Sequence, residues 1–483
     1  MSTQSALKNN KLLIHGIVIL ALMLIIGSLP PIEPITPLGM KLLGVFVGML
    51  YGWVCVDLVL PSIIGILMWG VVGNSTITDV FMEGFGNSTV ILLIFIFVFS
   101  TAINEAGIGQ FFATWLLTRK ALEGKPWVLT SVFLLAAFFV SATVNTFASM
   151  IICWGIMYEL CDKLGMKAKE SWPSFMVFGI TIAAILGGGS FAFKTVPAAV
   201  LGVYQTASKQ TVDFLGYSIV FWTLSLVVII GTLLLGRIMR TDVSKLKAVK
   251  TDMFDKKSLD LTRFQKVNLF CLALLIVTLM APAILPDGWA LTQVLNKLTS
   301  AGIIMAGVAI IICINVGGKP LVEFVPMAKK SVLWEPIILT AAVVPIGNAM
   351  MAEDAGISAW LSVTLGTLFS GMSVVIFSLL SFGIALILTN FANNGMTAVI
   401  FLPLIIQFSS MFGMSTNAMA VLLIFTVHVA LVTPAACPMS ALMFANKEWI
   451  EPKYIIKIGV PLLVWTLIAI LAVGLPVSSL VFN

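Results

Sequence analysis

The sequence predicts an all-α integral membrane protein with about eleven transmembrane helices, arranged as two inverted repeats with two re-entrant hairpins and two broken helices. Three observations predict this fold: the composition, the succession of apolar segments, and short segments that recur in both halves. Of the 483 residues, 60% are hydrophobic and only 10% are charged, whereas an average soluble domain has roughly 25% charged residues. So few charged side chains cannot cover a water-facing surface of this size. A soluble enzyme is therefore excluded.

Apolar windows place the membrane crossings along the chain. We interpret the first, residues 12–29, as a retained span rather than a signal peptide, because no small-residue cleavage site precedes Pro30. The other windows cover residues 38–54, 58–73, 88–104, 172–204, 217–236, 267–285, 299–316, 332–351, 417–445 and 455–478. Six cysteines lie mostly within or beside these windows without metal-ligand spacing, which is typical of free packing residues.

Two further apolar stretches, residues 128–161 and 372–408, are interrupted near their middles by polar residues. An arm of such a stretch reaches roughly 17 to 24 Å, which is less than the ~30 Å hydrocarbon core. We therefore predict re-entrant hairpins that enter and leave the membrane on one side.

The basic residues predict the topology. With a cytoplasmic N-terminus and non-crossing hairpins, cytoplasmic segments contain all of the 27 Lys and Arg residues except Lys41, Lys194, Lys209 and Lys297. This model places the C-terminus outside and predicts a multi-pass protein of the cell membrane, either plasma or inner. Because the net charge of +6 is explained by the cytoplasmic loops, it implies no nucleic-acid partner.

The predicted organisation has an N-terminal span (1–37), a first inverted repeat (38–236), a cytoplasmic loop (237–266) and a second inverted repeat (267–483). Residues 105–108 (Glu-Ala-Gly-Ile) recur as residues 354–357 (Asp-Ala-Gly-Ile), and the same displacement of 249 positions takes Asn145 to Asn394. Each repeat has five crossings, and an odd number inverts the second copy. This architecture is typical of secondary transporters, whose substrate site lies near the membrane midplane.

Four polar interruptions are the candidate site, because irregular backbone at membrane depth lines a cavity or is buried in protein. They are the hairpin tips, residues 141–146 and 389–397, and the breaks in the fifth and tenth spans, near residues 187–197 and 433–440. Their amide and hydroxyl groups, with the N–H groups of half-helix N-termini, suit a carboxylate or another oxyanion. Each Asn or Thr taken alone is equally compatible with contacts between helices, but the paired tips favour a binding site.

The acidic residues restrict the substrate. None of the 21 Asp and Glu residues lies in the middle of a predicted span, whereas cation pathways and carboxylate proton relays require acidic groups there. A cationic substrate is therefore not expected. No nucleotide-binding or hydrolase motif occurs, so we predict transport driven by gradients, with no enzymatic activity and no organic cofactor.

The order of hairpin, broken span, hairpin and broken span resembles the divalent anion/sodium symporters of the ion transporter superfamily. Asn145 and Thr146 match the Asn and Thr of that family's first Ser-Asn-Thr tip, and Asn393 and Asn394 match the Ser and Asn of the second. The resemblance covers nearly the whole chain. It implies dicarboxylate, citrate or sulfate as substrate, sodium symport, homodimers and an elevator mechanism.

The loops of the broken spans depart from the family pattern. Thr195 and Pro197 are kept in the first, but Lys194 stands where the family usually has Gly; in the second, residues 437–440 (Cys-Pro-Met-Ser) replace Thr-Pro-Pro-Asn. The resemblance implies substrate ligands and sodium ligands at separate sets of positions. The substrate set is Asn145, Thr146, Asn393, Asn394, Thr195 and Ser440. The sodium set is Ser141, Asn145, Gly189, Asn394 and Cys437.

Lys194 is the most consequential departure. A lysine at the centre of a membrane helix costs ~2.5 to 3.5 kcal/mol on the insertion scale, so it needs either a carboxylate partner or a function. We hypothesise that its ammonium group replaces the first sodium ion. The predicted function is a secondary carrier of di- or tricarboxylates by sodium symport. The alternatives are a sodium-independent exchanger or a proton-coupled carrier in which Lys194 replaces sodium, and, more remotely, an anion channel.

Overall fold

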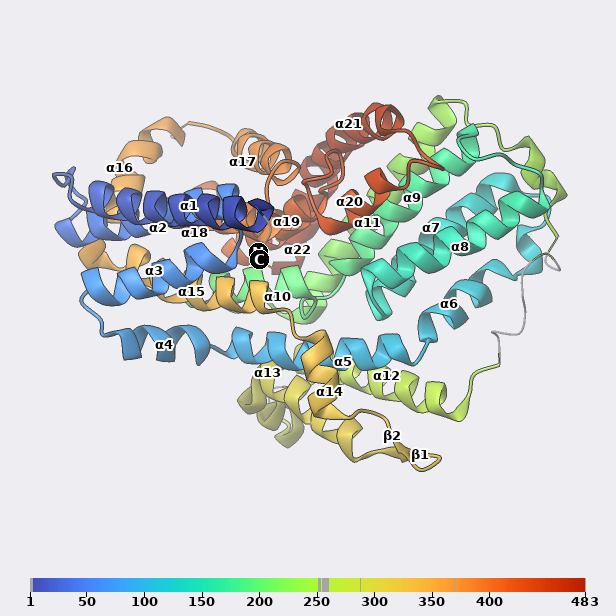
Figure 1. The fold of residues 1–483 in the computed structure, drawn as a ribbon, viewed down its shortest axis with the longest axis horizontal. Helices are drawn as coiled ribbons and strands as arrows, with labels where there is room; N and C mark the ends of the chain where they lie inside the picture. The colour runs from blue at the N-terminus through green and yellow to red at the C-terminus, as the bar shows by residue number, and fades with distance from the viewer. Residues whose placement is uncertain (1–2, 251–252, 254–259, 287, 370, 483) are drawn as a thin grey trace.

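The computed structural model describes residues 3–250, 253, 260–286, 288–369 and 371–482 (Figure 1). Helix α1 (Thr3–Gly27) precedes the first half of the chain. That half contains α2 (Pro37–Cys55), α3 (Val59–Val72), α4 (Ile77–Phe85), α5 (Ser88–Glu105), α6 (Ile108–Leu117), η1 (Lys120–Leu122), α7 (Pro126–Thr143), α8 (Thr146–Lys163), α9 (Ser171–Gly188), α10 (Thr195–Ser208) and α11 (Phe214–Ile238).

The second half repeats this order after a connecting segment that includes η2 (Ser244–Ala248). It contains α12 (Arg263–Ile284), α13 (Ala290–Cys313), the strands β1 (Asn315–Val316) and β2 (Lys319–Pro320), α14 (Phe324–Ser331), α15 (Trp334–Met351), η5 (Glu353–Ala355), α16 (Ile357–Phe369), α17 (Val374–Thr389), α18 (Asn394–Phe408), η6 (Ser409–Phe412), α19 (Thr416–His428), α20 (Pro438–Ala445), α21 (Pro452–Ala469), the π-helical turn η7 (Ile470–Gly474) and α22 (Leu475–Phe482). The two strands pair antiparallel.

The all-helical membrane fold is as predicted. Ten helices in the described part of the chain are long and apolar enough to cross a membrane, and shorter apolar helices accompany them. The predicted hairpins correspond to α7 with α8 and α17 with α18. The prediction that all their arms are too short to cross is wrong for α7 and for α18 with η6, which are among the ten long helices because they continue past the apolar windows. The expected broken helices are α9 with α10, separated by residues 189–194, and α19 with α20, separated by residues 429–437. In Figure 1, α7 and α8 lie in the right half of the molecule, and α18 lies in the left half.

Several short helices escaped the hydropathy windows. Amphipathic α4 and α14 carry charged side chains, such as Asp79 in the first turn of α4 and Lys330 in the last turn of α14. Helix α6 and its counterpart α16 are short segments that lead into the two hairpins. Each follows a glycine with positive φ, 72° at Gly107 and 68° at Gly356, so the recurring Ala-Gly-Ile segments form the same turn in both halves. Helix α13 runs from Ala290 to Cys313, so it both begins and ends before the predicted span of residues 299–316, and it is kinked at Thr299.

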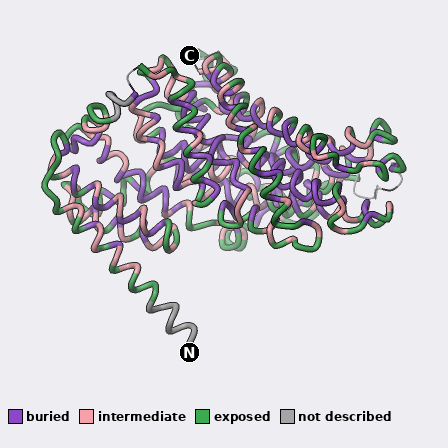
Figure 2. The backbone as a smooth tube through the Cα atoms, turned by 90° about the horizontal axis from the view of Figure 1, so that it is seen from above, coloured by how far each residue is buried: buried purple, intermediate pink, exposed green. Residues whose placement is uncertain are grey.

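The first segments of the two broken helices, α9 and α19, form the buried centre of the molecule. Helix α9 is 89% buried, and every residue of α19 from Ala418 to His428 is buried. A helix that is apolar on all sides is stable only inside a protein or a membrane. By contrast, α1, α12 and α21 expose large apolar side chains such as Ile17, Phe270 and Val464, as expected for surfaces that face lipid. Figure 2 shows this division between a buried interior and exposed outer turns.

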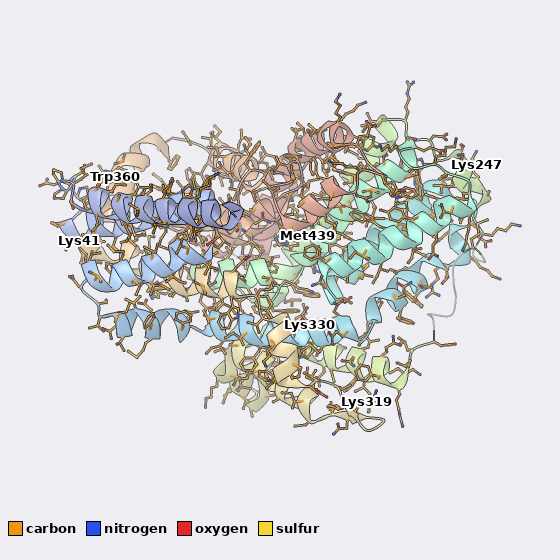
Figure 3. All side chains as sticks on the ribbon, viewed as in Figure 1. Lys41, Lys247, Lys319, Lys330, Trp360 and Met439 are labelled. Carbon is orange, nitrogen blue, oxygen red and sulfur yellow. The ribbon has the colours of Figure 1, made fainter. Side chains whose placement is uncertain are left out.

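Labelled side chains show where α20 lies in the molecule. Figure 3 shows Lys41 at one end, Lys247 at the opposite end, and Met439 of α20 near the middle. The first turn of α20 therefore lies between the two ends of the molecule.

Candidate functional site

The tip of the first hairpin is organised by Asn145. Only Val144 and Asn145 separate α7 from α8, and Asn145 is the N-cap residue of α8. Its Oδ1 accepts hydrogen bonds from the backbone N–H groups of Phe147 (2.8 Å) and Ala148 (3.4 Å). Asn is among the favoured N-cap residues because its side chain satisfies N–H groups that have no partner within the helix. The Nδ2 group of Asn145 has no hydrogen-bond partner among the described residues.

Asn393 does the same at the tip of the second hairpin. It is the N-cap residue of α18, and its Oδ1 accepts from the N–H groups of Gly395 (2.9 Å) and Met396 (3.3 Å). Asn145 therefore corresponds to Asn393, at a displacement of 248 positions. The displacement of 249 that relates the two glycine turns therefore does not relate the hairpin tips, because the stretch from Gly356 to Asn393 is one residue shorter than the stretch from Gly107 to Asn145.

Hydroxyl groups tie each tip to the broken helix of its own half. Ser141 Oγ donates to the carbonyl of Ala184 in α9 (2.5 Å), which uses its one hydrogen, and it lies at hydrogen-bond distance from Thr146 Oγ1 (3.1 Å). Thr389 Oγ1 donates to the carbonyl of Val427 in α19 (2.8 Å), which uses its one hydrogen, and it lies 3.1 Å from the side-chain amide of Asn394. Ser141 and Thr389 are also 248 positions apart, so both halves use one arrangement. Ser141 and Thr146 thus lie at the first tip with Asn145, and Asn394 lies at the second tip with Asn393.

Lys194 is the N-cap residue of α10 and is half-buried. Its Nζ donates to the backbone carbonyls of Ser141 (3.2 Å) and Val144 (3.5 Å). These carbonyls belong to the C-terminal end of α7, where the helix dipole is negative and the last carbonyls have no partner within the helix. Lys194 forms no ion pair with any carboxylate in the described part of the chain. The ammonium group is therefore held by backbone oxygens alone.

The carbonyls of the first loop also have protein donors. Tyr217 Oη in α11 donates to the carbonyl of Gly189 (2.8 Å), and Trp222 Nε1 donates to that of Ser190 (2.9 Å). Gly189 packs so tightly that an added Cβ would lie 2.3 Å from Phe221 and 2.7 Å from His428. Contact with His428 brings the break of the first half against the end of α19 in the second half.

The second loop surrounds Asn390, which is only 1% exposed. Asn390 Oδ1 accepts from the N–H groups of Leu431 (2.9 Å) and Val432 (3.0 Å). Its Nδ2 donates to the carbonyls of Leu386 (2.8 Å) and Val429 (3.2 Å). Thr433 Oγ1 donates to the backbone carbonyl of Asn390. This residue was not singled out from the sequence, because it is one of several amides in one polar tip and nothing local shows which of them faces the loop.

Of the remaining predicted residues, two form hydrogen bonds to the second loop and one has a hydroxyl group without a partner among the described residues. Ser440 is fully buried, and its single O–H is shared between the carbonyls of Thr433 (2.7 Å) and Leu431 (3.0 Å). Cys437 is the N-cap residue of α20, and its Sγ donates to the carbonyl of Ala430 (3.1 Å). Both side chains therefore hold the loop. Thr195 is half-buried in the first turn of α10, and its hydroxyl has no hydrogen bond among the described residues.

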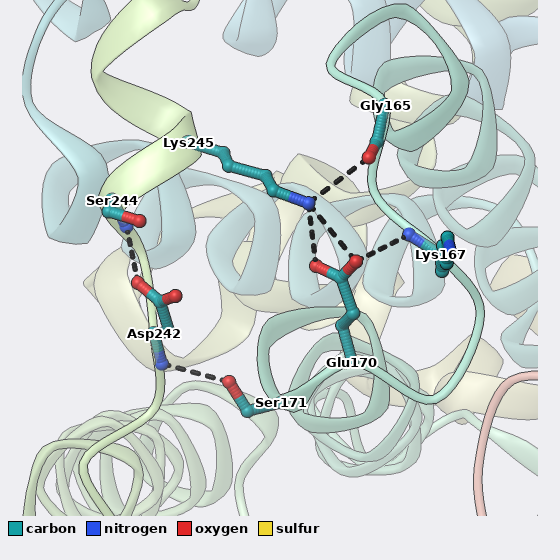
Figure 4. A network of polar contacts seen from close by, with 7 residues as sticks. All are labelled: Gly165, Lys167, Glu170, Ser171, Asp242, Ser244 and Lys245. Atoms are coloured by element: carbon teal, nitrogen blue, oxygen red, sulfur yellow. Dashed lines mark hydrogen bonds and ion pairs between the residues drawn. The ribbon is translucent and has the colours of Figure 1, made fainter.

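A separate polar network fastens the connection between α8 and α9 to the segment after α11 (Figure 4). Lys245 Nζ contacts both carboxylate oxygens of Glu170 (3.0 Å) and the carbonyl of Gly165 (3.1 Å). The N–H of Lys167 and then Lys245 hydrogen-bond to Glu170, which lowers the pKa of its carboxyl group. Asp242 N donates to Ser171 Oγ (2.9 Å). The start of the segment that connects the two halves is therefore bound to the first residue of α9.

Comparison with known proteins gives one family and a fold. A family model described as citrate transporter matches residues 49–428. An uncharacterised transporter of Schizosaccharomyces pombe is 20% identical over 406 residues, which is 83% of this chain and 44% of that protein. An uncharacterised transporter of Haemophilus influenzae is 19% identical over 459 residues, 95% of each chain. The chain thus spans less than half the length of the first relative and nearly all of the second.

Two solved structures are similar in fold. The YdaH transporter of Alcanivorax borkumensis has a TM-score of 0.56 at 16% identity, over 82% of this chain and 86% of that one. MtrF of Neisseria gonorrhoeae, from a class of antimetabolite efflux pumps, has a TM-score of 0.55 at 12% identity, over 96% of this chain and 93% of that one. At these identities the similarity indicates a shared fold alone.

Proposed function

The chain belongs to the citrate transporter family, a family of membrane transporters rather than enzymes, and from that premise we propose that it carries di- or tricarboxylate anions by alternating access. The observation that carries the proposal is the pair of Asn-capped half-helices: α8 begins at Asn145 and α18 begins at Asn393, at equivalent positions of the two hairpin tips. The finer resemblance to the divalent anion/sodium symporters predicts the same substrate class.

The capped tips suit carboxylates for two reasons. The N-terminus of a helix carries a partial positive charge and N–H groups, which together favour anions. In addition, each Asn uses its Oδ1 for the helix, so its Nδ2 donor can point toward a ligand. We propose that both tips bind the same anion, with one Nδ2 donor for each end of a dicarboxylate or for two carboxylates of citrate.

Lys194 favours sodium-independent coupling over the predicted sodium symport. Its ammonium group donates to the carbonyls of Ser141 and Val144, which are oxygens of the kind that would otherwise coordinate a hard cation. Unlike a bound sodium ion, a lysine cannot leave. The carrier without substrate would therefore hold an uncompensated positive charge in the membrane, which is costly, and the anion would compensate it. We propose exchange of one anion for another.

We propose that the hairpins and broken helices move as one body against α2, α5, α12, α13 and α15, as in an elevator. This is supported by the bonds from Ser141 and Thr389, each of which joins a hairpin to the broken helix of the same half. The proposal further includes a homodimer in the cell membrane, plasma or inner, with a cytoplasmic N-terminus and an external C-terminus.

Uptake into proteoliposomes tests this function. Vesicles preloaded with unlabelled citrate or succinate, and empty vesicles, receive labelled citrate or succinate with either sodium or choline outside. We expect uptake into preloaded vesicles only, at equal rates in both salts. Uptake into empty vesicles that requires an inward sodium gradient would instead establish sodium symport. No exchange of any di- or tricarboxylate, or of sulfate, would contradict the proposed substrate class.

A further inference from the structure

Asn390 uses the full hydrogen-bonding capacity of its side chain inside the second half of the site. An Asn amide has two donor N–H groups and an oxygen with two lone pairs. All four are used: two N–H groups of the loop, Leu431 and Val432, donate to the oxygen, and the carbonyls of Leu386 and Val429 accept from the nitrogen. The amide therefore joins the end of α17 to the loop between α19 and α20.

The first half joins the same elements with different chemistry. At the displacement of 248 that relates the tips, the counterpart of Asn390 is Ala142, which is buried and has no polar side chain. There the bridge from loop to tip is Lys194, whose ammonium group reaches the carbonyls of Ser141 and Val144. One half is thus closed by a fixed cation and the other by a neutral amide.

We infer that Asn390 is a positioning residue that closes the second half of the site without any bound cation, as Lys194 does in the first. This inference rests on the proposed function and deepens it, because it removes the position at which a single remaining sodium ion could couple to transport. It predicts a carrier that is independent of inorganic cations in both halves. Asn390 itself holds the loop and is not placed in contact with the substrate.

The substitution Asn390→Asp tests whether a neutral amide is required, because it replaces only the side-chain nitrogen by an oxygen. In Asn390→Asp, one oxygen still accepts from Leu431 and Val432, but the other replaces the nitrogen and faces the carbonyls of Leu386 and Val429. Three oxygens then converge with no donor. A proton on the carboxyl group restores the donor, and a sodium ion can be coordinated by the three oxygens, so the variant should acquire the ion dependence that the parent protein lacks.

The experiment measures citrate exchange and thermal unfolding of Asn390→Asp at pH 8 and pH 5.5, each in sodium or choline chloride, relative to the parent protein. In choline at pH 8 we expect exchange to fall roughly tenfold or more, since a buried polar group loses its partner. Acid or sodium should restore most of it. Asn268→Asp is the matched control, because Asn268 is equally buried, at 1% exposure, and its Nδ2 also donates to a carbonyl, but it lies in α12. Its unfolding should depend on pH as that of any buried carboxylate does, whereas its rate of citrate exchange should be equal in sodium and choline.

If Asn390→Asp does not fold, the melting temperature of the unmodified protein tests the inference instead. A citrate-dependent rise in its melting temperature tests the proposed substrate, and a rise in sodium relative to choline tests this inference separately. We expect the first and not the second. Sodium stabilisation of the unmodified protein, or an Asn390→Asp variant that exchanges citrate equally in all four conditions, would overturn the inference while leaving the substrate class intact.

Discussion

Ser100 on α5 donates a hydrogen bond of 3.2 Å to the carbonyl of Val144, the same carbonyl that Lys194 contacts at the tip of the first hairpin. This bond joins the helices proposed to stay fixed to the part proposed to move. A displacement of the hairpin against α5 must break it. The relationship therefore gives a direct test of which elements move.

We predict that Ser100→Ala increases the rate of citrate exchange severalfold. A neutral hydrogen bond contributes about 0.5 to 1.5 kcal/mol, and without it the hairpin can leave its present position against α5 more easily. The apparent KM should change little. Ser218→Ala is the control, since the Ser218 hydroxyl bonds only within α11, to the carbonyl of Phe214. Equal exchange rates for Ser100→Ala and the parent protein would argue against movement at this contact.

Lys194 provides the second prediction. In Lys194→Ala, the carbonyls of Ser141 and Val144 lose their donor, and the fixed positive charge is removed. We expect exchange in choline to fall roughly tenfold or more, and sodium to restore part of it by occupying the vacated position. Lys194→Arg keeps the charge and should retain exchange in choline. A sodium titration of both variants in proteoliposomes makes the comparison, and equal loss in the two at every sodium concentration would refute a role for the charge.

The fold could be predicted from the sequence because hydropathy and helix breaks are local signals. The polar tips likewise indicated Asn145 and Asn393. Other features depend on contacts between distant segments: Asn390 differs from its neighbours only because it faces residues 429–433, and Tyr217 and Trp222 matter only because α11 passes the first loop. The short helices α4 and α14 were missed because amphipathic segments dilute an apolar window.

The two cap residues provide the third prediction, which separates folding from binding. Asp is as good an N-cap residue as Asn, and its negative charge is favourable at a helix N-terminus. Asn145→Asp and Asn393→Asp should therefore keep the melting temperature of the parent protein. Both should lose exchange of dicarboxylates by roughly tenfold or more, mainly through KM, because like charges repel.

The control for the cap variants is Ser373→Asp, which adds the same charge at the N-cap of α17, at the far end of the hairpin from its tip. It should retain exchange. If the two Asn variants transport dicarboxylates as well as Ser373→Asp does, the capped tips are not the anion site.

The network of Figure 4 provides the last prediction, which concerns stability and pH. The pKa of Glu170 is lowered in the folded protein, first by the N–H of Lys167 and then by Lys245. Its contribution to stability is therefore fully present above the ordinary pKa of a glutamate, 4.5, and is lost as pH falls through the lower folded value. The pair is partly exposed, with 42% of the Lys245 side chain and 36% of the Glu170 side chain accessible, so the effect is small.

A double-mutant cycle of Glu170→Gln and Lys245→Met, followed by thermal unfolding in detergent, should give a coupling of about 0.2 to 1 kcal/mol at pH 7. The coupling should shrink in high salt and vanish in strong acid. Coupling that instead grows as the pH falls would show that the pair is not held by the ionised carboxylate.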